Sequence, residues 1–323
     1  VPAHESVCQK KQGFKEAKPT SPLLALYGYR RVLRDCDRYL ADLDQVRAVL
    51  RGICALYKQV YGPEAFAVHQ AKIFSRAMLL KIAESCVACI VTTWTATRHA
   101  AWKVIHAFEV GTGTRKDEFT KAFPADDCIM RANFVWVDGE GNELSMTVTV
   151  IASRIRGNLL RGKSAPSKCD RLNLEWSKQL QWFRLDEDDP LNFAYAFQQW
   201  ELAHPCPLHE RGNWPAFSPT GDMHPFSPSA AAHDHQQLLS ASIGAIDAAD
   251  RTIHSYRASL VSAMYVAKAK GNHEFTEGIM QAHVRHKTLD AMYGYGKMTP
   301  SNFADNIAKL TTMDPSLAKR EDL

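Results

Sequence analysis

The sequence predicts a mainly α-helical protein with a small antiparallel β-sheet, an α+β fold, on three observations. Apolar residues recur at three- and four-residue steps over residues 46–60 and again over residues 75–108, as they do on amphipathic helices. Residues 129–137 are apolar and aromatic, and the turn Asp138-Gly-Glu-Gly-Asn142 follows them, as at the end of a strand. No run of about 18 apolar residues occurs, so we expect no membrane span.

The first third of the chain is predicted to be helical after a polar start. Residues 1–21 are polar and Lys-rich, which is typical of a flexible arm. Residues 22–66 predict two helices, over 22–42 and 46–60, and Gly62-Pro63 ends the second. Ser75 is a candidate N-cap for a third helix, and a fourth begins near Trp94 and ends at Gly111-Thr-Gly113.

The middle of the chain predicts the sheet. Residues 129–137 form its first strand and the β-branched run 146–151 its second. The basic segment 154–171 is predicted as a hairpin or loop, with residues 172–174 as a short returning strand. Helix resumes over 190–202, and residues 204–235, which hold six Pro, predict a long loop. From Gln236 the chain is predicted to be mostly helical, ending in a polar tail over 311–323.

Charge is distributed unevenly along the chain, although the net charge is only +4. Residues 151–178 carry seven Lys or Arg against two acidic residues, a local +5, and residues 251–297 carry seven against three, a local +4. Such segments suit a phosphate-bearing partner. The basic residues that we expect to contact the phosphates of such a partner are Arg154, Arg156, Arg161, Lys163 and Arg171.

Cysteine and histidine usage indicates a reduced compartment. Eight Cys occur at irregular spacings, so we expect an intracellular protein, in the nucleus of a eukaryote or otherwise in the cytoplasm. Cys86 and Cys89 fit buried thiols on an apolar helix better than a metal pair. Residues 204–209 and 233–235 contain four His and one Cys, an alternative zinc cluster. The start at Val1-Pro-Ala-His suggests a fragment of a longer protein.

Four short motifs in a fixed order carry the functional prediction. Arg115 lies in Thr112-Gly-Thr-Arg115-Lys-Asp-Glu118, a His-x-x-Arg box spans residues 254–257, His286 follows Arg257 by 29 residues, and Tyr295 follows His286 by nine. These patterns resemble the T-G-x-R-x-x-E and H-x-x-R motifs, and the His–Tyr spacing, of the tyrosine recombinase (phage-integrase) family. Tyr295-Gly-Lys-Met also resembles the Y-A-R-M of some eukaryotic retroelement recombinases.

The resemblance implies a catalytic domain over residues 70–310. Residues 22–66 would then be the remnant of a core-binding domain. The implied reaction is site-specific DNA recombination or integration by transesterification, in which Tyr295 attacks a backbone phosphate and forms a 3′-phosphotyrosine intermediate. The implied partners are double-stranded DNA and further copies of the chain in a tetramer. No metal or other cofactor is expected, because Arg and His supply the positive charge.

The resemblance also assigns roles to the motif residues. Arg115, Arg257 and His254 would bind one phosphate, since a guanidinium can hold two of its oxygens. Lys168 in Ser167-Lys168-Cys-Asp170 would protonate the leaving 5′ oxygen, with Lys163 as an alternative. The interval between Arg257 and His286 is longer than the low twenties usual in the family.

Two assignments near the C-terminus have rivals. His286 would donate to a phosphate oxygen, and His283, on the same helical face, is an alternative. Tyr295 is the predicted nucleophile, with Tyr293 as its rival. Two other classes of function compete with the enzyme: a catalytically silent DNA-binding protein derived from a recombinase, and a helical metal-binding interaction protein.

Overall fold

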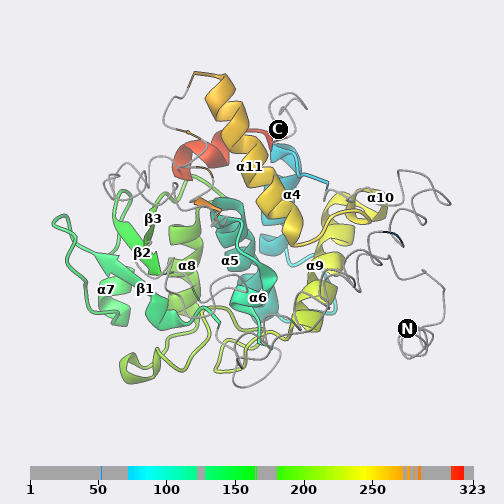
Figure 1. Cartoon of the computed structure of the whole chain (residues 1–323). Coiled ribbons are helices and arrows are strands. Elements are labelled where there is room, and N and C mark those ends of the chain that lie inside the picture. Colours follow the sequence, from blue (N-terminus) through cyan, green and yellow to red (C-terminus); the bar gives the residue numbers. More distant parts are fainter. Residues whose placement is uncertain are drawn as a thin grey trace. The chain divides into compact units, whose positions relative to one another are not determined.

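The computed structural model describes residues 52, 72–121, 128–163, 165, 180–271, 275, 276, 280, 283, 284 and 307–315. Contacts within the chain divide it into two compact units, Val1–Gln70 and Ala71–Leu323. All helices and strands discussed below belong to the second unit (Figure 1). The predicted arm and the helices over 22–66 lie outside the described residues, apart from Gly52, which is helical.

The second unit combines helices with a three-stranded antiparallel sheet, which confirms the α+β class. In chain order its elements are α4 (Arg76–Val87), α5 (Ala96–Thr112), α6 (Lys116–Phe119), the 3₁₀ turn η2 (Arg131–Asn133), β1 (Phe134–Val137), α7 (Val148–Ala152), β2 (Leu159–Lys163), β3 (Leu180–Arg184), α8 (Phe193–Ala203), the 3₁₀ turn η3 (Leu208–Glu210), α9 (Pro228–Ile243), α10 (Ala245–Ala248) and α11 (His254–Ala269). Residues 307–312 are also helical. In the part of the chain that the structure describes, no helix is long and apolar enough to cross a bilayer.

Side-chain caps fix where several helices begin. The Ser75 hydroxyl accepts from the backbone N–H of Met78, which confirms the predicted N-cap of α4. Thr95 caps α5 and Asn192 caps α8 in the same way. Each cap satisfies one of the N–H groups that a helix start leaves without a partner, which is worth about 1 kcal/mol. These short polar residues therefore set the start of the helices that carry the core.

Helix α5 is the central element of the second unit. Its buried residues, among them Trp102, Ile105 and Phe108, point to several sides of the helix. A helix that is apolar around most of its circumference is enclosed by other elements. α5 packs against α4, α8 and α11, and Figure 1 shows it between α8 and α4. The Phe108 ring also meets Phe193 of α8, with ring centroids 4.9 Å apart, so α5 anchors the core.

The sheet follows the strand order β1-β2-β3 and buries one face. Trp136, Leu160 and Phe183 lie side by side across the three strands, and each is almost completely buried. The neighbouring row contains Arg161 and is only partly buried. This alternation is the period of two expected for a strand with one face in the core.

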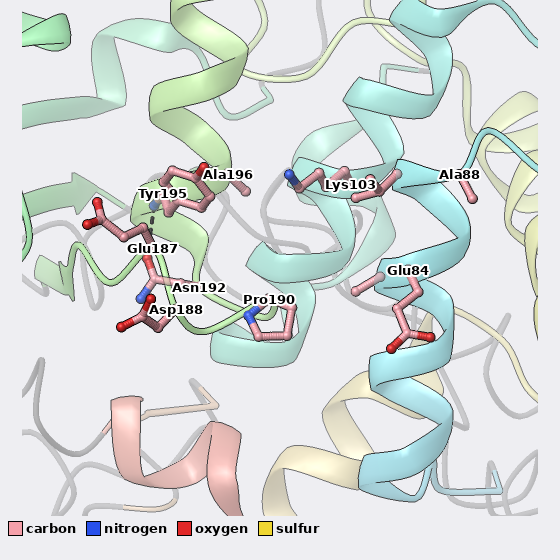
Figure 2. A pocket seen from close by; sticks show the side chains of 11 residues that line it. Glu84, Ala88, Lys103, Glu187, Asp188, Pro190, Asn192, Tyr195 and Ala196 are labelled. Atoms are coloured by element: carbon pink, nitrogen blue, oxygen red, sulfur yellow. Dashed lines mark hydrogen bonds between the residues drawn. The ribbon is translucent and has the colours of Figure 1, made fainter.

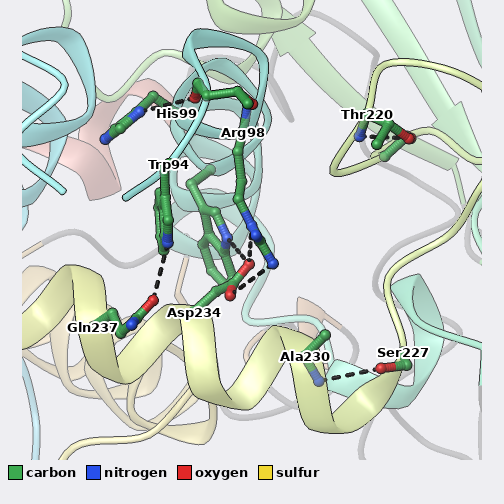
Figure 3. A network of polar contacts seen from close by, with 11 residues as sticks. Trp94, Arg98, His99, Thr220, Ser227, Ala230, Asp234 and Gln237 are labelled. Atoms are coloured by element: carbon green, nitrogen blue, oxygen red, sulfur yellow. Dashed lines mark hydrogen bonds and ion pairs between the residues drawn. The ribbon is translucent and has the colours of Figure 1, made fainter. Parts of the chain in front are cut away.

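A buried carboxylate joins α9 to α5. Asp234 accepts from the Arg98 guanidinium at 2.7 and 3.0 Å and from the Trp102 indole N–H at 3.2 Å (Figure 3). The Asp234 side chain is only 1% exposed, so these charge-assisted hydrogen bonds offset the cost of removing it from water. Gln237, one turn further along α9, accepts from the Trp94 indole at 3.0 Å. The start of α5 is therefore fixed against α9 by polar contacts as well as by packing.

Two sequence predictions for the middle of the chain are wrong, and one strand was missed. Residues 146–151 were predicted as a strand, but Thr147 caps the short helix α7, because its hydroxyl accepts from the N–H of Val150. The third strand is β3 at 180–184, which the sequence pattern missed, while residues 172–174 lie outside the described residues. The predicted loop over 204–235 ends early, since Ser227 caps α9 and Pro228 occupies its first turn. Local capping outweighed β propensity in the first case.

Candidate functional site

The site is built on the turn that follows α5. Gly113 ends the helix in the left-handed conformation, at φ 54°, and its N–H donates to the Glu109 carbonyl at 2.8 Å. The hydroxyls of Thr112 and Thr114 lie 2.7 Å apart and brace the turn. The chain then extends through Arg115, which precedes α6 and is half-buried. The predicted helix end and the position of Arg115 just after a glycine turn are both confirmed.

Helix α11 presses directly on this turn. A Cβ atom at position 113 would lie 2.9 Å from the Cα of Arg257, so glycine is required both for the backbone angle and for the close approach. The Arg257 guanidinium donates from Nη1 to the Gly113 carbonyl at 3.2 Å and is 4% exposed. The His-x-x-Arg box and the turn before Arg115, far apart in the sequence, therefore meet.

His254 is the first residue of α11 and lies on the same side of the helix as Arg257, one turn away. Its side chain is exposed, whereas that of Arg257 is buried. Partial burial lowers the pKa of His254, and the positive charges of Arg257 and Arg115 lower it further. His254 therefore lies in the field of both guanidinium groups and is neutral near pH 7. The structure therefore places three of the predicted site residues near one another, while their roles stay predictions.

A histidine from the C-terminal part of the chain also reaches the turn. His283 is buried, and its Nε2 lies 3.0 Å from the carbonyl oxygen of Gly111. Because a carbonyl oxygen only accepts, Nε2 carries the proton. His283 was the rival of His286, and the structure gives it a contact with the Gly111–Gly113 turn. His286, Tyr293, Tyr295, Lys168 and Arg171 lie outside the described residues.

Three of the basic residues predicted to contact DNA have partners within the chain. Arg156 forms ion pairs with Asp186 and Asp188, and Arg161 pairs with Glu143. Arg154 donates to the Val150 carbonyl at 3.1 Å and to the Ser153 hydroxyl at 2.9 Å. Lys163, at the end of β2, is exposed. The acidic run 186–189, which the sequence places apart from the basic segment, supplies the partners of Arg156.

The Cys and His residues that suggested a metal centre do not assemble into one. Among the residues that the structure describes, no group of three or more His, Cys, Asp or Glu has the geometry to hold a metal ion. This includes His204, Cys206, His209, His233 and His235, so the structure gives no support to a zinc site at these residues. Burial raises the pKa of the Cys86 thiol to about 12, as expected for a structural thiol.

A cavity of about 380 Å³ lies elsewhere, between α4, α5 and α8 (Figure 2). Its lining includes Lys103 of α5, whose ammonium lies 5.6 Å from the centre of the Tyr195 ring, and Glu84 of α4. Asp188, which also lines it, is already paired with Arg156. The cavity shares no lining residue with the site at the Gly113 turn, and it contributes nothing to that site.

Comparisons with known proteins do not identify the chain. No family model matches it, and no curated protein or solved structure matches it either. The functional argument therefore depends on the residues themselves.

Proposed function

We propose that the chain is a DNA strand-transfer enzyme of the tyrosine recombinase type. The observation that carries this proposal is the convergence of Arg115, His254 and Arg257 at the Gly113 turn. Two permanently charged guanidinium groups beside an exposed, neutral imidazole form a site suited to a phosphodiester, which has one negative charge and two non-bridging oxygens. In this proposal the residues over 70–310 form the catalytic domain.

The proposed reaction needs only protein groups and DNA. The Tyr295 phenolate attacks the phosphorus of a backbone phosphate, the P–O5′ bond breaks, and Lys168 (or Lys163) gives a proton to the leaving oxygen. The product is a 3′-phosphotyrosine and a free 5′-hydroxyl, and a 5′-hydroxyl from a second strand reverses the step. Arg115 and Arg257 stabilise the charge that develops on the non-bridging oxygens.

The histidines have separate proposed roles. His254 is neutral in the free protein, so it can donate one hydrogen bond to a phosphate oxygen without adding to the repulsion among the cations. A bound phosphodiester brings a negative charge, which would raise the pKa of His254 again. His286 is the proposed donor near the nucleophile, and His283, which holds the Gly111 carbonyl, supports the turn.

Binding of duplex DNA is proposed to use the basic residues near β2. Arg154, Arg156 and Arg161 form exposed or half-buried contacts that DNA phosphates can replace, because surface ion pairs contribute at most about 1 kcal/mol. Lys163 and Arg171 complete this proposed surface. Recombination exchanges strands between two duplexes, so a tetramer on DNA is part of the proposal.

The test is covalent capture of DNA by the full chain. The chain is incubated with a duplex that is nicked close to the cleavage site. Cleavage then releases a short fragment that carries the free 5′-hydroxyl and diffuses away, so the reaction cannot reverse. The covalent protein–DNA adduct should survive a denaturing gel. Tyr295→Phe should abolish the adduct and leave DNA affinity unchanged, while the matched variant Tyr293→Phe should still form it. The reverse pattern would move the nucleophile to Tyr293. DNA binding without an adduct on any substrate would favour the catalytically silent alternative.

A further inference from the structure

Helices α5 and α11 share a second contact, between two buried polar side chains. His106 of α5 and Tyr256 of α11 are 0% and 1% exposed. The Tyr256 hydroxyl lies 2.8 Å from Nδ1 of His106, and Nε2 of the same ring lies 2.9 Å from the Leu79 carbonyl on α4. One imidazole therefore connects three helices through the core.

The geometry fixes the direction of both hydrogen bonds. The Leu79 carbonyl oxygen can only accept, so Nε2 of His106 carries the proton and donates it. In a neutral ring Nδ1 is then an acceptor, and the Tyr256 hydroxyl donates to it. Burial lowers the pKa of His106 to about 4 and raises that of Tyr256 far above its usual range, so both groups stay neutral near pH 7.

This contact lies next to the candidate site on both helices. Tyr256 lies directly before Arg257 on α11, inside the His-x-x-Arg box, and had no assigned role. His106 is seven residues before Gly113 on α5, which is two helical turns, so both positions lie on the same side of that helix. The pair of helices thus has two fixed points, the His106–Tyr256 hydrogen bond and the contact between Gly113 and Arg257.

Two fixed points constrain different movements. The close approach at Gly113 sets the distance between the helices, but the hydrogen bond at this point comes from the end of the long Arg257 side chain, which can follow a rotation of α11 about its axis. A buried hydrogen bond is directional, and its loss leaves the imidazole nitrogen unsatisfied. Apolar side chains of similar size would fill the same space, so the polar pair adds orientation rather than volume.

We infer that His106 is a positioning residue, which through its hydrogen bond with Tyr256 holds α11 in the rotation that directs His254 and Arg257 toward the Gly113–Arg115 turn. This inference rests on the proposed function for its catalytic consequence, but the positioning itself concerns the folded chain alone. It predicts that removing the Tyr256 hydroxyl from the core changes the surroundings of the exposed His254 side chain at the site.

The experiment replaces Tyr256 by Phe and follows His254 directly. The pKa of His254 is measured by nuclear magnetic resonance on histidine-labelled full chain, with its signal identified by its absence in His254→Gln. In Tyr256→Phe we expect this pKa to move up toward its ordinary value of about 6.5, because α11 turns away from Arg115. We also expect the single-turnover cleavage rate at saturating DNA to fall roughly 10²-fold, with DNA affinity retained.

A matched variant separates positioning from stability. Gln198→Met removes a buried amide whose hydrogen bonds reach the Ile151 and Arg154 carbonyls, away from α11. It should lower the melting temperature without moving the pKa of His254. If Tyr256→Phe does not fold, the double variant His106→Leu with Tyr256→Phe leaves neither polar group unpaired and should show the same pKa change.

The pKa of His254 decides the inference whether or not the chain cleaves DNA. An unchanged pKa in the folded variants would show that the pair is merely structural and would overturn the inference. Absence of an adduct from the unmodified chain would instead overturn the proposed function, and the pKa comparison would still test the positioning.

Discussion

The contact between α5 and α11 and the surface around β2 both carry arginines, but they hold them differently. Arg257 is 4% exposed and donates to the carbonyl of Gly113, where an added Cβ atom would lie 2.9 Å from the Cα of Arg257. The Arg156 side chain is 59% exposed and pairs with two carboxylates that water can replace. The first environment fixes the direction of a guanidinium, and the second supplies only charge.

In the proposed function, this difference separates two tasks on DNA. Stabilising a transition state requires groups whose position is set before the reaction, because an error of about 1 Å costs about 10²-fold in rate. Attracting a duplex requires positive charge that can rearrange along the backbone. We therefore expect changes between α5 and α11 to affect stability and rate, and changes near β2 to affect affinity and its dependence on salt.

The largest expected effect is a fall in the free energy of unfolding at acidic pH, because buried histidines lie in the helical core. Burial lowers the pKa of His106 to about 4, and burial together with the charge of His106 lowers that of His235 to about 3. In the unfolded chain both titrate near 6.5, so the unfolded state binds more protons below that pH. The free energy of unfolding should be fully present above pH 6.5 and fall by several kcal/mol as the pH drops toward 4.

Urea denaturation at a series of pH values measures this loss. His235→Gln should flatten the pH dependence, because one buried titrating group is removed. His209→Gln is the matched control, since His209 is exposed. Equal pH profiles for the unmodified chain and both variants would show that the buried imidazoles do not govern the acid sensitivity.

Replacing arginine by lysine should slow DNA cleavage at the contact between α5 and α11 much more than on the surface near β2. Arg257→Lys keeps the charge but loses the two-pronged donor, so single-turnover cleavage should fall on the order of 10²–10³-fold. Arg156→Lys, on the surface near β2, should leave the rate within about twofold, because an exposed ion pair depends little on donor geometry. A loss of the same size in both variants, measured at saturating DNA, would contradict the distinction.

The glycine at the turn should be as sensitive as the arginine that it contacts. Gly113→Ala places a Cβ atom 2.9 Å from the Cα of Arg257 at a left-handed φ, so we expect about 3 kcal/mol of destabilisation. Gly157→Ala is the control, since its φ is also positive but no atom lies within 4 Å of its added Cβ. Only the backbone cost, about 1–2 kcal/mol, should remain there. Similar melting temperatures for the two variants would mean that α11 can move away from the turn.

The sequence predicted the helices of the core well because their signals are local. The hydroxyl of Ser75 caps α4, and the glycine after Thr112 ends α5, as their residue types suggest. The family resemblance implied that Arg115 and the His254–Arg257 box share one site, and the structure places these three residues near one another, while their catalytic roles stay predictions. Lys168, His286 and Tyr295 stay predictions, because they lie outside the described residues.

Other features could not be read from sequence, because they depend on residues far apart in the chain. The partner of Tyr256 is His106, 150 residues away, and no local pattern marks that pairing. β-branched residues at 146–151 favoured a strand, but the cap at Thr147 and packing of α7 on α8 made a helix. The partners of Arg156 come from the acidic run after β3, which the sequence alone placed apart from the basic segment.

The smallest effect on stability should come from the surface near β2. Replacing Arg154, Arg156 and Arg161 together by Ala should change the free energy of unfolding by about 1 kcal/mol or less, since their contacts are half-buried or exposed.

The same triple variant should weaken DNA binding and reduce the slope of log affinity against log salt by up to about one unit for each lost phosphate contact. Lys72→Ala removes an exposed cation that pairs with Asp250, outside the basic segments, and should leave the slope unchanged. In the proposed function these residues attract the duplex without touching the reacting phosphate, so the cleavage rate at saturating DNA should match that of the unmodified chain. A slope that stays the same in the triple variant would show that this surface faces solvent in the complex, and the duplex would then have to be held by the cations around the Gly113 turn.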